Sequence, residues 1–392
     1  MTATLRTQVG IVGAGPSGLL LSHLLHLAGI ESVVLEDRTR SYVEERIRAG
    51  VIEHGAAALL EDAGVGARLR REGLRHTGVN LHFHGVNHRI DLADLTDGKA
   101  VTVYGQHEVV KDLIAARLAA GGDVRFDVKD VAIHDFKGTA PELHFVEQGQ
   151  SKKLVCDFVA GCDGFHGIAR PTVPAGELRF FDRQYPFGWL GILAKAPPAC
   201  EELVYARHAD GFALLSMRSP EISRLYLQCE PDDDIANWPD ARIWAELTRR
   251  LGGLATEGPM LQKGITAMRS FVTEPMQSGR LFLAGDAAHI VPPTGAKGMN
   301  LAIGDVRLLA RALEAQIKRG DGTKLDAYST TALRRIWKAQ RFSWWMTSLL
   351  HKFGDETPFD ERRQIADLEY LVSSRAALAS LAENYVGLPY DD

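Results

Sequence analysis

The N-terminal part of the chain combines short apolar runs with a helical pattern. Residues 9–12 (VGIV) and 32–35 (SVVL) are apolar runs of the kind that form buried parallel strands. Between them, leucines recur along a broad helical face that ends near Gly29, as at a glycine C-cap. The order of strand, turn, helix and strand predicts a Rossmann-like nucleotide-binding unit.

The pattern differs along the rest of the chain. Residues 51–72 and 108–119 predict helices, and short strands with turn signals between them predict a meander within residues 124–146. Residues 181–230 are rich in aromatic and β-forming residues. They predict a half-buried sheet that is too aromatic to continue the first unit. From residue 299 onwards the pattern is mainly helical.

These patterns predict an α/β protein (α+β overall) with two closely joined domains and a C-terminal helical region. The first is a Rossmann-like domain built from discontinuous segments, and the second is a β-sheet domain for a substrate. The expected limits are residues 1–75, 100–180 and 270–345 for the first domain, 76–99 and 181–269 for the sheet domain, and 346–392 for a helical interface region.

The glycine-rich turn after the first apolar run fits the pattern G-x-G-x-x-G and also contains Ser17. Gly13 permits a tight turn, Gly15 leaves the backbone open to a pyrophosphate, and Gly18 lets the following helix pack on the strand. Glu36 ends the next strand, where a carboxylate can accept hydrogen bonds from both ribose hydroxyls. The stretch predicts a dinucleotide site, and it leaves open whether the dinucleotide is FAD or NAD.

A second strand-end carboxylate favours FAD. Asp286 follows the buried strand at residues 281–284, and a helix begins near Gly298 and Met299. The amides that open this helix suit an anion or a polarised carbonyl. A protein that binds only a nicotinamide nucleotide does not need a second polyol site, whereas the ribityl chain of FAD does. Upstream, Arg46 lies just beyond the phosphate-binding turn and could meet a diphosphate, although a solvated charged surface is the alternative.

Composition and charge exclude several classes of protein. The formal net charge of -5 gives no overall attraction to nucleic acid or to an anionic membrane, and no apolar run is long enough to span a membrane. The four cysteines show no C-x-x-C pattern and are interpreted as reduced thiols of a cytoplasmic protein. His82, His84 and His88 alternate like one polar face of a strand, and no neighbouring motif supports a metal site.

Three groups of residues resemble the fingerprints of the single-component flavoprotein aromatic hydroxylases. They are the glycine-rich turn with Glu36, Cys162-Asp163-Gly164 with Arg170, and Gly285-Asp286. The resemblance covers essentially the whole chain. It implies noncovalent FAD, NADH or NADPH as reductant and O2 as co-substrate. Longer runs, among them residues 46–50, 161–167, 185–191 and 280–297, resemble a member of this family that acts on 4-hydroxybenzoate. They imply hydroxylation of this small aromatic acid at the 3-position to give 3,4-dihydroxybenzoate. A homodimer is expected, with no nucleic-acid or membrane partner.

The resemblance also implies roles for individual residues. Arg48, Gln106, Asp163 and Asp286 would contact FAD, and Arg224 would steer the flavin position. The residues expected beside the flavin are Thr294, Lys297, Gly298, Met299 and Asn300. The residues expected at the substrate are Ser216, Arg218 and Tyr226 for its carboxylate, Tyr205, Tyr385 and the Pro293 carbonyl for its phenol, and His76 at the solvent end of a proton relay.

Two other classes of function remain open at this stage. One is an FAD-dependent oxidase or reductase of the same fold that acts on another small aromatic acid without inserting oxygen. The other is a non-enzymatic flavin-binding redox sensor. The choice of reductant is also open: Asp37 stands where the best-known NADPH-using members carry a basic residue. We therefore expect NADH to be used well, either with NADPH or in preference to it.

Overall fold

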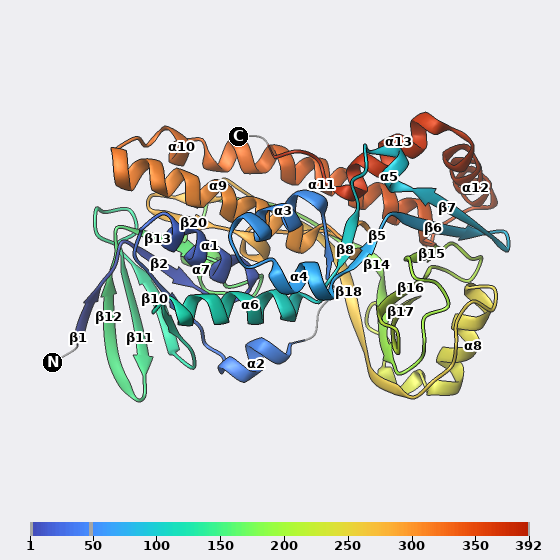
Figure 1. Ribbon diagram of the computed structural model, residues 1–392, viewed down its shortest axis with the longest axis horizontal. Helices are drawn as coiled ribbons and strands as arrows, with labels where there is room; N and C mark the ends of the chain where they lie inside the picture. Colours follow the sequence, from blue (N-terminus) through green and yellow to red (C-terminus); the bar gives the residue numbers. More distant parts are fainter. Residues whose placement is uncertain (1–2, 47–49, 391–392) are drawn as a thin grey trace.

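Two groups of sheets lie side by side along the long axis of the molecule (Figure 1). The computed structural model describes residues 3–46 and 50–390. One half contains a six-stranded and a four-stranded sheet, and the other contains an eight-stranded sheet. The mixture of parallel sheet, antiparallel sheet and helices confirms the predicted fold class.

The six-stranded sheet has β2 near its centre and carries the predicted nucleotide-binding unit. Its order is β19 (Gln277–Ser278), β20 (Leu281–Leu283), β13 (Phe158–Gly161), β2 (Val9–Val12), β3 (Ser32–Leu35) and β9 (Asp123–Arg125). All pairs are parallel except β19 with β20. The inner strands are buried throughout because apolar segments cover both faces, as their continuous apolar runs predict.

Three helices pack beside this sheet and against one another: α1 (Pro16–Leu27), α6 (Gln106–Ala119) and α9 (Gly298–Arg319). The short helix α2 (Arg40–Glu45) lies beside α6, at the surface (Figure 1). The loops that precede α1 and α9 therefore open at one edge of the sheet, where its parallel strands end.

A separate four-stranded sheet contains the predicted meander. β10 (Lys129–His134), β11 (Glu142–Glu147) and β12 (Gln150–Val155) are antiparallel, and β1 (Ala3–Arg6) pairs in parallel with β12. One part of the prediction is wrong: the strand near residue 124 is β9, which joins the parallel sheet. It does so because its residues pair with β3.

The eight-stranded sheet forms the other half, in the order β21-β18-β14-β17-β16-β15-β6-β7. The strands are β6 (Gly78–Phe83), β7 (Val86–Asp91), β14 (Arg179–Ala194), β15 (Val204–Ala206), β16 (Ala213–Ser219), β17 (Ile222–Cys229), β18 (Met260–Glu274) and β21 (His289–Ile290). The paired strands β14 and β18 are long enough to extend from one hydrophobic core to the next. The helix α8 (Asp240–Arg250) covers the core formed by residues of β14 to β17.

The stretch at residues 51–72 is not one helix. It contains the short strand β4 (Val51–Ile52), then α3 (His54–Asp62) and α4 (Ala67–Glu72). Gly64 interrupts the helical pattern, since it adopts a φ of 76°. A three-stranded sheet joins β4 to β8 (Val101–Val103) and β5 (Leu74–His76), which carries His76. The remaining short helices α5 (Leu92–Leu95), α7 (Ala169–Thr172) and α10 (Thr323–Asp326) connect the larger elements.

The C-terminal helices join the two halves. α11 (Tyr328–Leu350) runs between them, and α12 (Pro358–Ser373) and α13 (Arg375–Val386) follow. After α13 the chain returns to α11, where Arg335 Nη1 donates to the Leu388 carbonyl at 2.7 Å. The expected domain limits stay a prediction.

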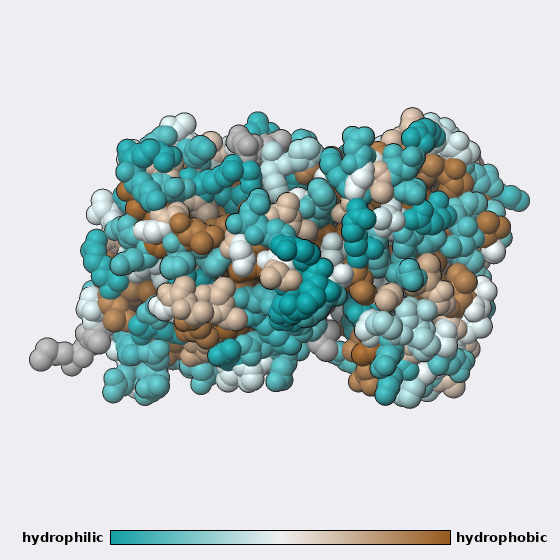
Figure 2. All heavy atoms as spheres, in the orientation of Figure 1, coloured by the Kyte–Doolittle hydropathy of each residue, from teal (hydrophilic) through white to brown (hydrophobic). Residues whose placement is uncertain are grey.

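The surface is mainly hydrophilic on the face shown in Figure 2, where hydrophobic residues form separate groups. Within residues 3–46 and 50–390, no helix is both long and apolar enough to cross a membrane.

Candidate active site

The glycine-rich turn between β2 and α1 has the geometry of a phosphate-binding loop. Gly13 adopts a φ of 102°, and a Cβ there would lie 2.5 Å from the Cys162 carbonyl oxygen. A Cβ at Gly18 would lie 1.9 Å from the Gly13 carbonyl oxygen. A Cβ at Gly15 would meet no atom of the described residues within 4 Å, so these residues leave open space in front of this backbone. Only glycine suits the first two positions, and Gly15 leaves room for a ligand.

Glu36 is fixed against this turn. Its two carboxylate oxygens accept hydrogen bonds from the Ala14 amide at 2.7 Å and the Arg38 amide at 3.0 Å. Burial raises the pKa of Glu36, although the two amides oppose the shift. The carboxylate retains lone pairs for the hydroxyls of a ribose at the end of β3. The turn and Glu36 together fit the adenosine end of FAD.

The second strand-end carboxylate, Asp286, lies in a short 3₁₀ turn after β20. Asp305 on α9 holds this turn: its Oδ2 accepts hydrogen bonds from the Gly285 amide at 2.9 Å and from His289 Nε2 at 2.6 Å. Burial alone would lower the pKa of His289, but the Asp305 carboxylate raises it. His289 and Asp305 were not among the predicted site residues. The histidine in G-D-A-A-H was the available signal.

The middle fingerprint lies between the other two. Asp163 Oδ2 accepts a hydrogen bond from the Ala169 amide at 2.8 Å, and burial raises the pKa of this carboxyl. Arg170 donates to the carbonyls of Ala287 at 2.9 Å and Phe165 at 2.6 Å. It therefore ties the middle fingerprint to the Asp286 turn. Because β20, β13 and β2 are neighbours, the structure assembles the three fingerprints at one edge of the sheet.

The loop before α9 is held by buried polar contacts. Thr294 is fully buried, and its Oγ1 lies 3.0 Å from Thr347 Oγ1. Asn300 Nδ2 donates to the carbonyls of Val51 at 2.9 Å and Ala296 at 2.8 Å, and its Oδ1 accepts from the Glu53 amide at 2.9 Å.

Three further predicted residues lie in or beside this loop. Pro293 is exposed, and its carbonyl accepts a hydrogen bond from the Ala296 amide at 2.9 Å. Gly298 and Met299 begin α9 and are partly buried. The expected contacts of all three with substrate or flavin stay predictions.

Lys297 is buried and faces the C-terminal segment. Its ammonium pairs with Glu53 at 2.6 Å and donates to the carbonyls of Asn384 and Tyr385. Burial lowers the pKa of Lys297, and Glu53 opposes the shift. This network holds the backbone of Tyr385 against the start of α9. A direct contact between Lys297 and the cofactor stays a prediction.

Tyr205 and Tyr385 meet in the interior. Their hydroxyl oxygens lie 2.8 Å apart, and their rings are nearly perpendicular, at 89°. Tyr205 comes from β15 of the substrate sheet, and Tyr385 comes from the last turns of α13. Burial raises the pKa of both phenols, so both hydroxyls remain protonated near neutral pH. The pair can therefore donate and accept protons along a hydrogen bond.

His76 is buried on β5, and neither of its ring nitrogens has a hydrogen-bond partner in the described part of the chain. Burial lowers its pKa, and the nearby Arg218 charge acts in the same direction. A proton path from Tyr385 to His76 would need water between them. The place of His76 in the relay stays a prediction.

The four predicted residues on β16 and β17 form a polar patch on adjacent strands. Ser216 pairs with Arg224 in the strand register, and Arg224 Nε lies 3.3 Å from the Tyr226 hydroxyl. Within the described residues, Nη1 of Arg218 and Nη1 of Arg224 are buried without a hydrogen-bond partner. Burial lowers the pKa of Arg218. Buried guanidinium nitrogens without partners suit an anionic ligand.

Two of the remaining predicted cofactor residues lie at the ends of helices. Gln106 is the first residue of α6 and is partly buried. Arg46 is exposed at the end of α2, with its guanidinium carbon 5.9 Å from the centre of the Tyr42 ring. Arg48 lies outside the described residues. The expected contacts of these three with FAD stay predictions.

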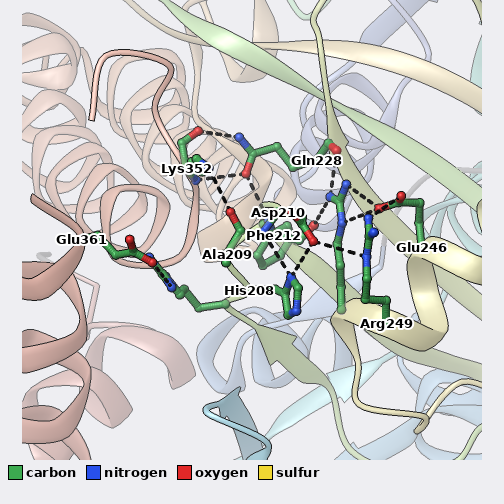
Figure 3. A network of polar contacts seen from close by, with 11 residues as sticks. His208, Ala209, Asp210, Phe212, Gln228, Glu246, Arg249, Lys352 and Glu361 are labelled. Atoms are coloured by element: carbon green, nitrogen blue, oxygen red, sulfur yellow. Dashed lines mark hydrogen bonds and ion pairs between the residues drawn. The ribbon is translucent and has the colours of Figure 1, made fainter. Parts of the chain in front are cut away.

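A network absent from the sequence predictions fixes the turn between β15 and β16 (Figure 3). Gln228 Oε1 accepts from the Phe212 and Lys352 amides, both at 3.0 Å, and Lys352 Nζ donates to the Ala209 carbonyl at 3.0 Å. On the other side, Arg250 Nη1 donates to the Gln228 carbonyl at 3.0 Å. The network ties the strands of Tyr205 and Arg218 to α8 and to the segment after α11.

Comparisons with known proteins agree with this geometry. A family model described as "FAD binding domain" matches residues 6–343. The chain is 50% identical to p-hydroxybenzoate hydroxylase of Acinetobacter baylyi, over 99% of this chain and 97% of that protein. It is 25% identical to 3-(3-hydroxy-phenyl)propionate/3-hydroxycinnamic acid hydroxylase of Mycolicibacterium gilvum, over 84% of this chain and 57% of that longer protein.

A solved structure shares the fold. The p-nitrophenol 4-monooxygenase of Pseudomonas putida superposes with a TM-score of 0.86 at 21% identity, covering 99% of this chain and all of that one. The turn at Gly13, the two strand-end carboxylates and the matched family model all point to one assignment. The chain belongs to the FAD-binding-domain family of flavoprotein hydroxylases that includes p-hydroxybenzoate hydroxylase.

Proposed function

We propose that this protein is an NAD(P)H-dependent, FAD-containing monooxygenase that converts 4-hydroxybenzoate to 3,4-dihydroxybenzoate with O2. The observation that carries the proposal is the pairing of two complementary sites on neighbouring strands. The buried guanidinium nitrogen of Arg218 suits a carboxylate, and the Tyr205–Tyr385 hydroxyl pair suits a phenol. A para-hydroxylated benzoate presents these two groups at opposite ends of one ring.

The benzoate end of the substrate would be bound by charge and hydrogen bonds. Arg218 offers a planar fork that matches a carboxylate, and the hydroxyls of Ser216 and Tyr226 can add hydrogen bonds. Because Arg218 Nη1 already lies in a buried site without a partner, a bound carboxylate would remove an existing desolvation cost. An uncharged phenol would leave that cost in place.

The phenol end would be activated by removal of its proton. A phenolate ring is more electron-rich than a phenol ring, and it therefore reacts faster with an electrophilic oxygen. Tyr205 can accept the hydrogen bond of the phenol and pass a proton to Tyr385, at 2.8 Å, without opening the site to bulk solvent. Water near His76 would complete the path to solvent.

FAD, when bound, supplies the redox chemistry that activates O2. The residues that would hold it are the turn at Gly13 to Gly18, Glu36 at a ribose, and Asp286 at the ribityl chain. The three fingerprints lie at one edge of the parallel sheet, as a dinucleotide stretched across the domain requires. The loop at Thr294 and the start of α9 would lie beside this cofactor.

The reductant would approach over the exposed helix α2. Asp37 is well exposed and lies 3.5 Å from Arg38, and Arg40 pairs with Glu44 at 2.7 Å. These pairs offset much of the positive charge that the 2′-phosphate of NADPH would need. We therefore propose that NADH is used well, with NADPH or in preference to it.

The proposals for assembly and location rest on exposed aromatic side chains and on the cysteines. Trp337 and Trp344 on α11, and Phe359 and Tyr370 on α12, are large exposed apolar side chains that a second copy of the chain could cover. We propose a homodimer formed through this C-terminal region. The four cysteines are free thiols, which suits the reducing cytoplasm.

The test of the reaction is nucleotide oxidation with product analysis. NADH or NADPH oxidation should be slow alone, faster with 4-hydroxybenzoate, and accompanied by 3,4-dihydroxybenzoate identified by mass spectrometry. Benzoate, which has the carboxylate but no phenol, is the matched control and should give no hydroxylated product. Peroxide without hydroxylated product would instead indicate an oxidase, and no stimulation by 4-hydroxybenzoate would favour a redox sensor.

A further inference from the structure

His351, the residue that directly follows α11, is buried among aromatic rings of the substrate half. His351 is fully buried and stacks on Phe187, with ring centres 4.7 Å apart, and on Phe212, at 4.3 Å. Phe212 in turn stacks on Trp189 at 5.0 Å. The planes of these stacked neighbours differ by at most 22°. The position of the imidazole is therefore fixed on both faces.

The two ring nitrogens of His351 are fixed as well. Trp189 Nε1 carries a hydrogen and only donates, so His351 Nε2, at 2.7 Å, must be the acceptor. The hydrogen of the neutral imidazole is then on Nδ1, which donates to the Thr347 carbonyl at 3.0 Å. A protonated ring would place an N–H against the indole N–H. Burial also lowers the pKa of His351 to about 3, which agrees with the neutral form.

The contacts of His351 lead to both sides of the proposed active site. On one side, the Trp189 ring lies 4.8 Å from the ring of Tyr226, which is proposed to bind the substrate carboxylate. On the other side, Thr347 Oγ1 donates to the Ser343 carbonyl at 2.7 Å. The same hydroxyl oxygen lies 3.0 Å from Thr294 Oγ1. The same turn of α11 thus binds His351 and holds the loop expected beside the flavin.

We infer that His351 is a positioning residue, which sets the distance between the substrate strands and the Thr294 loop by holding the Trp189 indole. The inference rests on the proposed function. It assigns His351 no contact with substrate or flavin. Its effect would be on geometry: a small displacement of the substrate ring relative to the activated oxygen would let the oxygen escape as peroxide.

The test compares His351→Phe, Trp189→Phe and the double variant with the parent holoenzyme. His351→Phe keeps a stacking ring and deletes both hydrogen bonds, whereas Trp189→Phe deletes the indole donor and part of the ring surface but keeps the His351–Thr347 bond. We expect His351→Phe to retain FAD, to weaken 4-hydroxybenzoate binding about tenfold, and to release peroxide in place of part of the product. The double variant should be no worse than His351→Phe alone, because His351→Phe already removes the contact that Trp189→Phe breaks.

A matched control separates positioning from general stability. His23 is another buried histidine, with one hydrogen bond to the Ala63 carbonyl at 2.8 Å, in the nucleotide-binding half. His23→Phe should lower the melting temperature and leave the ratio of product to oxidised nucleotide unchanged. If His351→Phe does not fold, Trp189→Phe carries the test, and an unchanged product ratio in that variant overturns the inference.

The failure of this inference can be told from the failure of the proposed function. If the parent forms 3,4-dihydroxybenzoate while His351→Phe keeps the parent's substrate affinity and product ratio, the positioning role is wrong. Additive effects of the two single variants would also overturn it. If the parent itself forms no hydroxylated product, the proposed function is wrong. The dissociation constant for 4-hydroxybenzoate then still tests whether His351 orders the substrate strands.

Discussion

The hydroxyl oxygens of Tyr205 and Tyr385 lie 2.8 Å apart, although the residues are 180 positions apart in the chain. The contact forms because β15 places Tyr205 in the interior, while the Lys297–Glu53 pair holds the backbone of the C-terminal segment beside it. A buried hydroxyl pair of this kind has two uses. It can hydrogen-bond a phenol, and it can carry the phenol's proton away.

The first prediction concerns this pair. Tyr205→Phe and Tyr385→Phe keep the rings and delete the relay, so hydroxylation should fall by about 10²-fold, within the usual range for general acid–base catalysis. Reduction of the flavin by dithionite should not change. Tyr185→Phe is the matched control, since it also deletes a hydroxyl in the substrate half, bonded to Ser270 at 3.2 Å. Rapid-reaction kinetics showing parent rates of hydroxylation in both relay variants would refute the assignment.

The second prediction concerns the carboxylate site. Arg218→Ala should weaken binding of 4-hydroxybenzoate by roughly 3–5 kcal/mol, because it removes one partner of a buried charge pair. FAD should remain bound. Arg242→Ala, which removes an exposed guanidinium stacked on Trp238 in the same half, should leave binding unchanged. Titration of the oxidised enzyme with 4-hydroxybenzoate measures the dissociation constants of the parent, Arg218→Ala and Arg242→Ala. An unchanged value for Arg218→Ala would place the carboxylate elsewhere.

The third prediction concerns the cofactor. A methyl group at Gly15 meets no atom of the described residues within 4 Å, so Gly15→Ala should fold normally and yet obstruct the pyrophosphate of FAD. We expect FAD affinity to fall about tenfold or more, which corresponds to about 1.4 kcal/mol. Gly264→Ala is the matched control, because a Cβ there also meets no atom of the described residues and Gly264 lies near the start of β18, in the eight-stranded sheet. Equal FAD affinity in the two variants would argue against a phosphate-binding role for the turn.

The fourth prediction concerns the reductant. Repulsion between the Asp37 carboxylate and the 2′-phosphate of NADPH would amount to only on the order of 1 kcal/mol at about 4 Å in water. Its effect on the rate with NADPH is therefore less than about tenfold. NADH should therefore be used well by the parent, and Asp37→Arg should raise kcat/KM for NADPH relative to NADH. A strong preference of the parent for NADPH, with no gain in the variant, would contradict this.

The nucleotide-binding edge could be predicted from the sequence because its signals are local. Gly13, Gly18 and Glu36 all lie within one continuous stretch of strand, turn, helix and strand, so their order along the chain is visible in the sequence. The single helix expected at residues 51–72 was wrong, since the left-handed φ of Gly64 outweighs an otherwise helical pattern.

Other parts of the candidate site depend on tertiary contacts. His351 and Trp189 are far apart in the chain, and nothing in the pattern of α11 distinguishes His351 from an ordinary buried residue. The same holds for Asp305, whose neighbours in α9 are mostly buried apolar residues. Such residues acquire their partners only when the helices pack against the sheets.

The most direct test of the central claim is the fate of molecular oxygen. The holoenzyme is incubated with 4-hydroxybenzoate, NADH or NADPH and oxygen-18 gas, and the product is analysed by mass spectrometry while nucleotide oxidation is followed. The account predicts 3,4-dihydroxybenzoate in which the new hydroxyl carries the labelled oxygen, formed in proportion to the nucleotide oxidised. Unlabelled 3,4-dihydroxybenzoate, or labelled peroxide without any 3,4-dihydroxybenzoate, would contradict it.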